Sequence, residues 1–253
     1  MAIDVGNTQT VYGVWDRSAW RAQWRRATKH EDTEDEIIAW LKLMFELDEI
    51  PLHLDGVVAA SVVPSLDLSI SRLAEKWLKC PCYFLRHGDQ VGIPVDYQPA
   101  TSVGADRIAN VLAAMAIVKP PFIVVDFGTA TTFDVVDGRG HYLGGSIMTG
   151  VEVSSAALFG RTAKLPQVAL EVPEKAIGQS TPSALQSGIM FGYAGAVDAI
   201  VARIRAELGS EAVALATGGL GGKFIGAAKT LDSYHPMLTL DGLVMALPSL
   251  KAE

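Results

Sequence analysis

Near its start the sequence reads Asp4-Val5-Gly6-Asn7-Thr8-Gln9-Thr10, and 122 residues later it reads Asp126-Phe127-Gly128-Thr129-Ala130-Thr131-Thr132. Each copy follows an apolar run and precedes a strand-like segment, 11–15 or 133–136, that ends in a turn. A strand, a glycine-containing turn and a second strand are typical of a β-hairpin. Two such hairpins in matching contexts predict a duplicated protein, with an N-terminal half at 1–115 and a C-terminal half at 116–253.

The segments around the hairpins alternate between helix and strand patterns. Thr33 and Glu36 have capping-box spacing ahead of an apolar helical period, and 56–63 is a nearly apolar run typical of a strand buried on both faces. The sequence therefore predicts an α/β protein of two lobes, each a mixed sheet flanked by helices, with a cleft between them. Further elements are expected as a helix at 66–78, a strand at 83–85, a helix from Ser102, a helix with Thr181 as N-cap that ends at Gly209, a strand at 211–216 and a helix at 241–247.

Composition excludes several classes of function. Apolar residues make up 49% of the 253 and charged residues 19%, which is rich enough for a full core. No run reaches the roughly 18–20 consecutive apolar residues of a membrane helix, and the first residues do not resemble a signal peptide. The net charge is −7 without a concentrated basic cluster, so nucleic acid is not an expected partner. We expect a soluble, cytoplasmic protein that binds neither nucleic acid nor membrane.

The cysteines and histidines predict no metal site of their own. Cys80-Pro81-Cys82 supplies at most two ligands and lacks the C-x-x-C spacing of redox pairs, and the five histidines form no ligand cluster. We therefore expect the two cysteines to be plain buried thiols at the start of a strand.

Both hairpin turns combine an acidic residue with glycine and threonine. The backbone N–H groups of such a turn can surround an anion, and the carboxylate can hold Mg²⁺ directly or through water. One such turn is common, but two copies, together with Thr217-Gly218-Gly219 after a third strand, indicate a cleft that binds nucleotide phosphates. The alternative is three tight turns without a function. P-loop, dinucleotide-binding and G-x-S-x-G motifs are absent.

A second motif, Gly104-Ala105-Asp106-Arg107, lies at the predicted start of a helix. In one interpretation Asp106 simply suits the positive end of the helix. In the other, Asp106 is a general base for a substrate hydroxyl and Arg107 binds a substrate carboxylate or phosphate. Spacing alone does not choose between them.

With these motifs the chain resembles the type III pantothenate kinases of the actin, Hsp70 and sugar-kinase superfamily. The resemblance implies a duplicated actin-like (ribonuclease H-like) fold. It also implies transfer of the γ-phosphoryl group of ATP to the 4′-hydroxyl of pantothenate, the first step of coenzyme A synthesis. It extends over nearly the whole chain and rests on DVGNTQT (4–10), SVVP (61–64), VGADRIAN (103–110), VVDFGTATTFDVV (124–136), GG (144–145), AKLP (163–166), IGQST (177–181), QSGI (186–189), Tyr193, TGG (217–219) and LTL (238–240).

The resemblance also implies roles for individual residues. Asp4 would place Mg²⁺, and Asp126 would lie at a site for a monovalent cation, K⁺ or NH₄⁺. Asp106 would take the proton of the substrate hydroxyl. The family's homodimers complete each active site across the interface, so Thr181 would serve the neighbouring subunit. The full ATP set is Asp4, Val5, Gly6, Asn7, Thr8, Gln9, Thr10, Val11, Thr129, Gly218 and Gly219, and the pantothenate set is Tyr97, Gly104, Ala105, Asp106, Arg107 and Thr181.

Two segments depart from the family pattern. A loop that usually reads Gly-Pro-Gly-Val-Lys-Thr-Gly is Arg-His-Gly-Asp-Gln-Val-Gly at 86–92, and Thr149 and Glu152 replace a proline and an apolar residue. These changes concern substrate affinity and dimer packing rather than the nucleotide core. They leave open a regulatory or binding protein that keeps the fold without the reaction, and a kinase for another small hydroxylated acceptor. The matches at Tyr97 and Arg107 favour pantothenate over a sugar.

Overall fold

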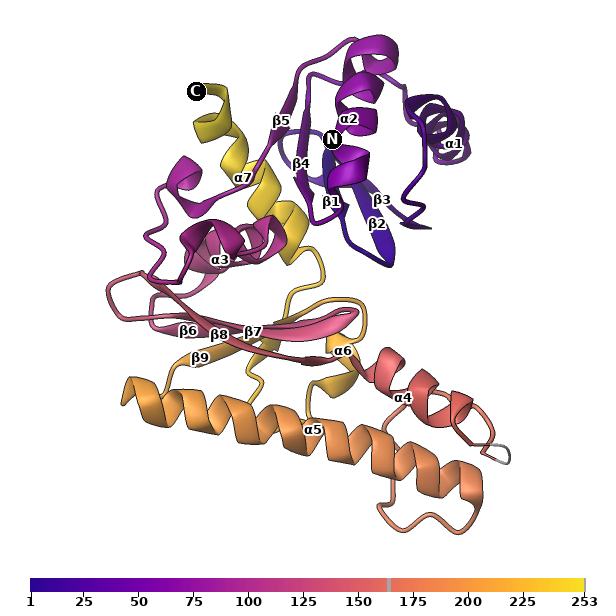
Figure 1. Cartoon of the computed structure of the whole chain (residues 1–253), viewed down its shortest axis with the longest axis vertical. Helices are drawn as coiled ribbons and strands as arrows, with labels where there is room; N and C mark the ends of the chain where they lie inside the picture. The colour runs from indigo at the N-terminus through magenta and orange to yellow at the C-terminus, as the bar shows by residue number, and fades with distance from the viewer. Residues whose placement is uncertain (163–164, 253) are drawn as a thin grey trace. The chain divides into compact units, whose positions relative to one another are not determined.

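The computed structural model describes residues 1–162 and 165–252, so the first two residues of the motif at 163–166 lie outside the described part. The chain forms two compact units (Figure 1). Unit 1 comprises Met1–Ala113 with Leu238–Glu253, and unit 2 comprises Ala114–Met237. The chain passes from unit 1 to unit 2 between Ala113 and Ala114, close to the expected boundary between residues 115 and 116. The C-terminal helix differs from that expectation, because it belongs to unit 1 rather than to the second half.

Unit 1 is built on a mixed sheet whose strands run in the order β3-β2-β1-β4-β5. The hairpin expected at the first motif is present, since β1 and β2 pair antiparallel, as do β2 and β3. β4 pairs parallel with both β1 and β5. The bounds are β1 Ala2–Val5, β2 Gln9–Trp15, β3 Trp20–Ala27, β4 Val57–Ser61 and β5 Cys82–Phe84.

Helices bury the apolar side chains of this sheet. The predicted capping box is confirmed: the Glu36 amide donates to Thr33 Oγ1 at 3.3 Å, and the Thr33 amide donates to Glu36 Oε2 at 2.9 Å. The helix expected at 66–78 is an α-helix followed by π-helical turns. The bounds are α1 Glu34–Leu47, α2 Pro64–Arg72, the π-helix Leu73–Leu78, 3₁₀ turns Gly88–Val91 and Ala100–Ser102, α3 Ala105–Ile117 and α7 Leu238–Ala252.

Unit 2 repeats the topology of unit 1. Its sheet has the order β10-β9-β6-β7-β8, with β6, β7 and β8 antiparallel and β9 parallel to both β6 and β10. Strand for strand, this is the order of the first sheet, so the duplication predicted from the two heptapeptides is confirmed. The bounds are β6 Phe122–Phe127, β7 Ala130–Val136, β8 Tyr142–Thr149, β9 Val213–Thr217 and β10 Ser233–Tyr234, with helices α4 Val151–Gly160, α5 Thr181–Leu208 and α6 Gly221–Phe224.

The long helix α5 runs along the sheet of unit 2 (Figure 1). Its N-cap is Ser180, whose side chain accepts a hydrogen bond from the Ser183 amide, so the expected cap at Thr181 is wrong by one residue. The predicted end at Gly209 is confirmed, since this residue has φ of 60°, where glycine is favoured. By length and composition alone α5 could cross a bilayer, but one face of it is buried in the core of unit 2, as in core helices of globular proteins.

Candidate active site

The turn between β1 and β2 presents exposed backbone beside a carboxylate. The Gly6 amide donates to the Gln9 carbonyl at 3.1 Å, which closes the turn. Residues 7–9 are exposed, whereas Thr10 is buried. Asp4 lies just before the turn on β1, between Val11 of β2 and Ala60 of β4. The arrangement suits the binding of a phosphate group and its counter-cation.

The turn between β6 and β7 brings three predicted residues to one edge of the sheet of unit 2. Asp126 pairs with Thr217 of β9, so Gly218 follows directly beside it, and Thr129 lies in the turn itself. Gly218 has φ of 84°, and a Cβ atom there would lie 2.5 Å from Asp126 Oδ1. Glycine is therefore required at 218 to allow the backbone to approach the carboxylate. Gly219, the next residue, is exposed.

Asp106 lies in the first turn of α3, as predicted. Its Oδ1 accepts a hydrogen bond from the Arg107 amide at 2.9 Å, and a Cβ atom at Gly104 would overlap the carboxylate. Burial raises the pKa of the Asp106 carboxyl above its usual value, and the Arg107 amide and guanidinium offset part of this effect. A partly desolvated carboxylate beside a buried arginine is suited to accept a proton from a bound hydroxyl.

The divergent loop at 86–92 is held by its own residues. Gln90 Oε1 accepts hydrogen bonds from the backbone amides of Arg86 at 2.7 Å and His87 at 3.2 Å. Gly88 approaches Val95 so closely that a Cβ would lie 2.7 Å from Val95 Cγ2, and Gly92 has φ of 71°. The two glycines shared with the family pattern are thus required by the backbone, and Gln90 orders the segment without the usual lysine and threonine.

The predicted residues divide between the two units. Tyr97 lies between the two 3₁₀ turns of unit 1, and Thr181 begins α5 at an exposed position outside the group around Asp126. Unit 1 carries Asp4, Val5, Gly6, Asn7, Thr8, Gln9, Thr10, Val11, Tyr97, Gly104, Ala105, Asp106 and Arg107, and unit 2 carries Asp126, Thr129, Thr181, Gly218 and Gly219.

The carboxylates fit cations that bind together with a nucleotide. Among the described residues no group of three or more His, Cys, Asp or Glu side chains could hold a metal ion. Mg²⁺ in nucleotide sites is commonly held by one or two carboxylates, water and the phosphates themselves. Asp4, next to the open turn, and Asp126, next to the Gly218 backbone, match this pattern rather than a closed protein cage.

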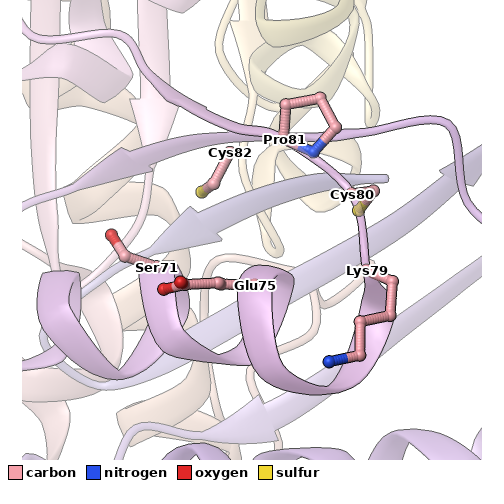
Figure 2. A pocket seen from close by; sticks show the side chains of 6 residues that line it. All are labelled: Ser71, Glu75, Lys79, Cys80, Pro81 and Cys82. Atoms are coloured by element: carbon pink, nitrogen blue, oxygen red, sulfur yellow. The ribbon is translucent and has the colours of Figure 1, made fainter.

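Two hollows in unit 1 contain none of the predicted site residues. One, of about 880 Å³, lies between the β2–β3 turn, residues 48–58 and α7. The other, of about 490 Å³, is lined by Cys80 and Cys82 and faces Ser71 and Glu75 of the neighbouring helix (Figure 2). Both cysteines are free thiols, as expected, but they are half-buried rather than buried, and only Cys82 begins a strand. Burial raises the pKa of Cys82 to about 12. At neutral pH this thiol is protonated, so it is neither a ready nucleophile nor a ready metal ligand.

Two residues that support the hairpin turns were missed by the sequence reasoning. Thr28 follows β3 and its amide donates to the Thr8 carbonyl at 2.9 Å, while Gly150 follows β8 and donates to the Thr129 carbonyl at 3.0 Å. Their matching places become visible only when the third strand of each half is aligned with its hairpin. The signal in the sequence was the polar or glycine residue that directly follows each of these strands.

Comparison with known proteins agrees with this geometry. The family model described as type III pantothenate kinase matches residues 1–203. The chain belongs to the type III pantothenate kinase family. A type III pantothenate kinase of Paramagnetospirillum magneticum is 42% identical over 96% of this chain and 95% of its own length. That of Moorella thermoacetica is 41% identical over 96% of both chains.

Solved structures confirm the fold of this family member. A Campylobacter jejuni protein described as a Baf family transcriptional activator superposes with a TM-score of 0.63 at 19% identity, over 100% of this chain and 99% of its own. The ethanolamine utilization protein EutJ of Carboxydothermus hydrogenoformans superposes with a TM-score of 0.52 at 12% identity, over 98% and 88%. At these identities the likeness shows the fold alone.

Proposed function

We propose that this chain transfers the γ-phosphoryl group of ATP to the 4′-hydroxyl of pantothenate, the first step of coenzyme A synthesis. The observation that carries the proposal is Asp106, a partly desolvated carboxylate held at the start of α3 beside Arg107. A module that only binds ligands does not need a base of this kind. The similarity to curated pantothenate kinases over 96% of the chain supports the choice of acceptor.

The chain's own residues supply position, charge and one proton acceptor. Asp106 accepts the proton of the 4′-hydroxyl, and Arg107, with five N–H donors, holds the carboxylate end of the acceptor. The backbone of residues 6–9 orients the phosphates. Phosphoryl transfer depends mainly on such positioning and on charge neutralisation, so little covalent chemistry is required of the protein.

Two cations are part of the proposal. Asp4 would hold Mg²⁺, which neutralises phosphate charge when bound with ATP. Asp126, with Thr129 and the Gly218 backbone at the same edge of unit 2, would hold a monovalent cation, K⁺ or NH₄⁺. Support comes from the carboxylate that each turn places next to exposed backbone.

We also infer a homodimer in which Thr181 serves the neighbouring subunit. Support comes from apolar side chains that unit 2 leaves exposed, led by Ile177 with 83% and Ile147 with 63% of its surface accessible. Val153 and Leu158 on α4 are exposed as well. Apolar side chains that gather into one exposed patch mark surfaces that bind another protein, and the proposed interface joins these positions of unit 2. An Ile177→Glu variant should elute as a monomer in size-exclusion chromatography with light scattering, while Leu47→Glu, an exposed site of unit 1, should not change the mass.

A cytoplasmic location is the remaining part of the proposal. The two cysteines are free, which is typical of proteins kept in a reducing compartment. ATP, the proposed donor, is a cytoplasmic metabolite. Fractionation of the source cells with an antibody against the chain would test this directly.

The experiment that tests the proposed activity is ATP consumption by the purified protein with Mg²⁺ and K⁺, with and without pantothenate. Pantothenate-dependent turnover that falls when Na⁺ replaces K⁺ would support both the acceptor and the cation. ATP binding without turnover would instead favour the regulatory alternative. Turnover with a different hydroxylated acceptor, and none with pantothenate, would support a kinase for another small acceptor. The divergent loop at 86–92 would then be the first segment to test for a role in acceptor choice.

A further inference from the structure

We propose that Thr28 is a positioning residue for the phosphate-binding turn, because it fixes the direction of two backbone N–H groups that face ATP. The inference rests on the proposed function, since it assigns a role within the nucleotide site. Thr28 lies directly after β3, opposite the Gly6–Gln9 turn, and it belongs to neither the ATP set nor the pantothenate set.

Thr28 binds two carbonyl groups of the turn. Its hydroxyl donates to the Gly6 carbonyl at 2.6 Å, and its backbone amide donates to the Thr8 carbonyl at 2.9 Å. Thr10 Oγ1 lies 2.9 Å from Thr28 Oγ1. Because the Thr28 proton is directed to Gly6, the Thr10 hydroxyl must be the donor in this pair. The hydroxyl groups thus form a chain of two hydrogen bonds, from the buried Thr10 to Thr28 and from Thr28 to the Gly6 carbonyl.

These two bonds orient the donors on the opposite side of the turn. The peptide bonds after Gly6 and Thr8 are trans, and in a trans peptide the C=O and N–H groups point in opposite directions. With both carbonyls directed at Thr28, the N–H groups of Asn7 and Gln9 face away from it. Asn7 and Gln9 are exposed. Two N–H groups of one turn that point outward in this way can bind an anion together.

Unit 2 provides an internal comparison for this role. Gly150 occupies the matching place after β8, and its amide makes the matching bond to the Thr129 carbonyl at 3.0 Å. A Cβ atom at 150 would overlap the carbonyls of Gly128 and Thr129. In unit 2 the turn therefore packs directly against the backbone of Gly150, whereas in unit 1 the side chain of Thr28 lies between the turn and the backbone of residue 28. A hydroxyl at position 28 is thus a feature of the first turn alone.

The test compares Thr28→Val, which keeps the shape but removes the hydroxyl, with Thr28→Ser, which keeps the hydroxyl. We expect Thr28→Val to raise KM for ATP about tenfold, which corresponds to about 1.4 kcal/mol, the upper range of one hydrogen bond. KM for pantothenate should remain within twofold of wild type, and Thr28→Ser should restore KM for ATP. Wild-type KM for ATP in Thr28→Val, equal increases in both KM values, or a serine variant as poor as valine would overturn the proposal.

A second measurement separates this proposal from the proposed function. Hydrogen exchange of residues 6–9 reports on the turn without turnover, and it should be faster in Thr28→Val than in wild type and Thr28→Ser. If the wild type consumes no ATP with pantothenate but the exchange result holds, the proposed function fails and the positioning role stands. Equal exchange in all three proteins would overturn the positioning role whatever the activity.

Discussion

The two units share a strand order but differ at their first turns. In unit 1 Asp4 pairs with Val11, whereas in unit 2 Asp126 pairs with Thr132, so the turn of unit 1 contains one residue more. In sequence the two heptapeptides align without a gap, but in structure they are offset by one residue after the glycine. Thr8 therefore corresponds to Thr129. The longer turn exposes more backbone to a ligand.

The buried threonine of each hairpin shows how the two turns are anchored. Thr10 and Thr131 occupy the same place, and both are buried. Thr10 bonds to Thr28 within its own sheet, whereas Thr131 bonds to the hydroxyl of Tyr193 on α5, which donates to the Thr149 carbonyl at 2.9 Å. Both turns are thus held by the residue that follows the third strand, but the buried threonine of the first bonds to that residue, whereas the buried threonine of the second bonds to a helix.

The turns that follow β2 in unit 1 and β7 in unit 2 are alike. Asp16 accepts hydrogen bonds from the amides of Ser18 and Ala19, and Asp137 accepts them from the amides of Arg139 and His141. In both cases these bonds lower the pKa of the carboxyl to about 2. The turns that carry the site residues thus differ between the halves, whereas these turns do not.

The helices that follow the fifth strand of each sheet, α3 after β5 and α7 after β10, carry aspartates with different surroundings. Substitution of the aspartate in α3 has the largest effect that we expect. Asp106 lies in the first turn of α3, whereas Asp241, in the first turn of α7, accepts a hydrogen bond from Trp20 Nε1 at 2.8 Å. We expect Asp106→Asn to lower kcat by about 10²- to 10⁴-fold, because the general base is lost, while ATP binding is kept. Asp241→Asn is the matched control, because the amide oxygen can still accept from Trp20. Steady-state kinetics of both variants would decide, and unchanged turnover in Asp106→Asn would remove its role.

The next largest effect is on folding. Gly150→Ala should destabilise the protein by about 3 kcal/mol, because its Cβ overlaps two backbone carbonyls that cannot move away independently. This corresponds to a fall in melting temperature of about 6–12 °C for a chain of this size. Gly160→Ala is the control, since nothing lies within 4 Å of a Cβ there. Equal melting temperatures in the two variants would show that the second turn tolerates a side chain, as the first does.

Much of this fold follows from short-range sequence signals. The hairpins, the Thr33–Glu36 capping box and the helix end at Gly209 were predicted because each depends on residues close in the chain. The supporting roles of Thr28 and Gly150 were missed, since they depend on the register of a third strand. The return of α7 to unit 1 was also missed, because an apolar helix pattern does not say which sheet it covers.

For the candidate site, the sequence predicted where some residues lie in their elements, but not what surrounds them. The position of Asp106 in the first turn of a helix was predicted correctly, but the burial that raises the pKa of its carboxyl depends on packing that no local pattern encodes. The one-residue offset between the turns was hidden because Thr follows Gly or Asn in both copies. Alignment of the motifs by sequence alone therefore matched some residues to the wrong partner.

A smaller effect is expected where α5 anchors the second turn. Tyr193→Phe removes the hydroxyl that links Thr131 to the Thr149 carbonyl, and should cost about 1 kcal/mol, or about 2–4 °C in melting temperature. Tyr83→Phe, on the half-buried edge strand β5, serves as the control. If Tyr193→Phe also changed KM for ATP as strongly as Thr28→Val, the two turns would not differ in how they are held.

The smallest expected effects are opposite changes in the pH dependence of stability. Burial raises the folded-state pKa of Asp106, so the protein favours the protonated carboxyl. The ionised form therefore costs stability increasingly as pH rises above 3.8, and in full above the raised pKa. Asp106→Asn should thus be more stable than wild type at pH 7–8, and this gain should shrink as the pH approaches 4.

Asp137 should behave in the opposite way, because its pKa is lowered from 3.8 to about 2. Its ionised carboxylate stabilises the folded state above pH 3.8, and this contribution is lost as pH falls through about 2. Asp137→Asn should therefore be less stable than wild type at pH 7–8, by a small amount since the group is at the surface. Urea unfolding of both variants between pH 2 and 8 measures the two trends, since the Asp137 contribution changes below about pH 4 and the Asp106 cost changes above it. Parallel trends would mean that the carboxyl at the start of α3 is as well stabilised as a turn aspartate, which would contradict its description as a destabilised base held in place for proton transfer.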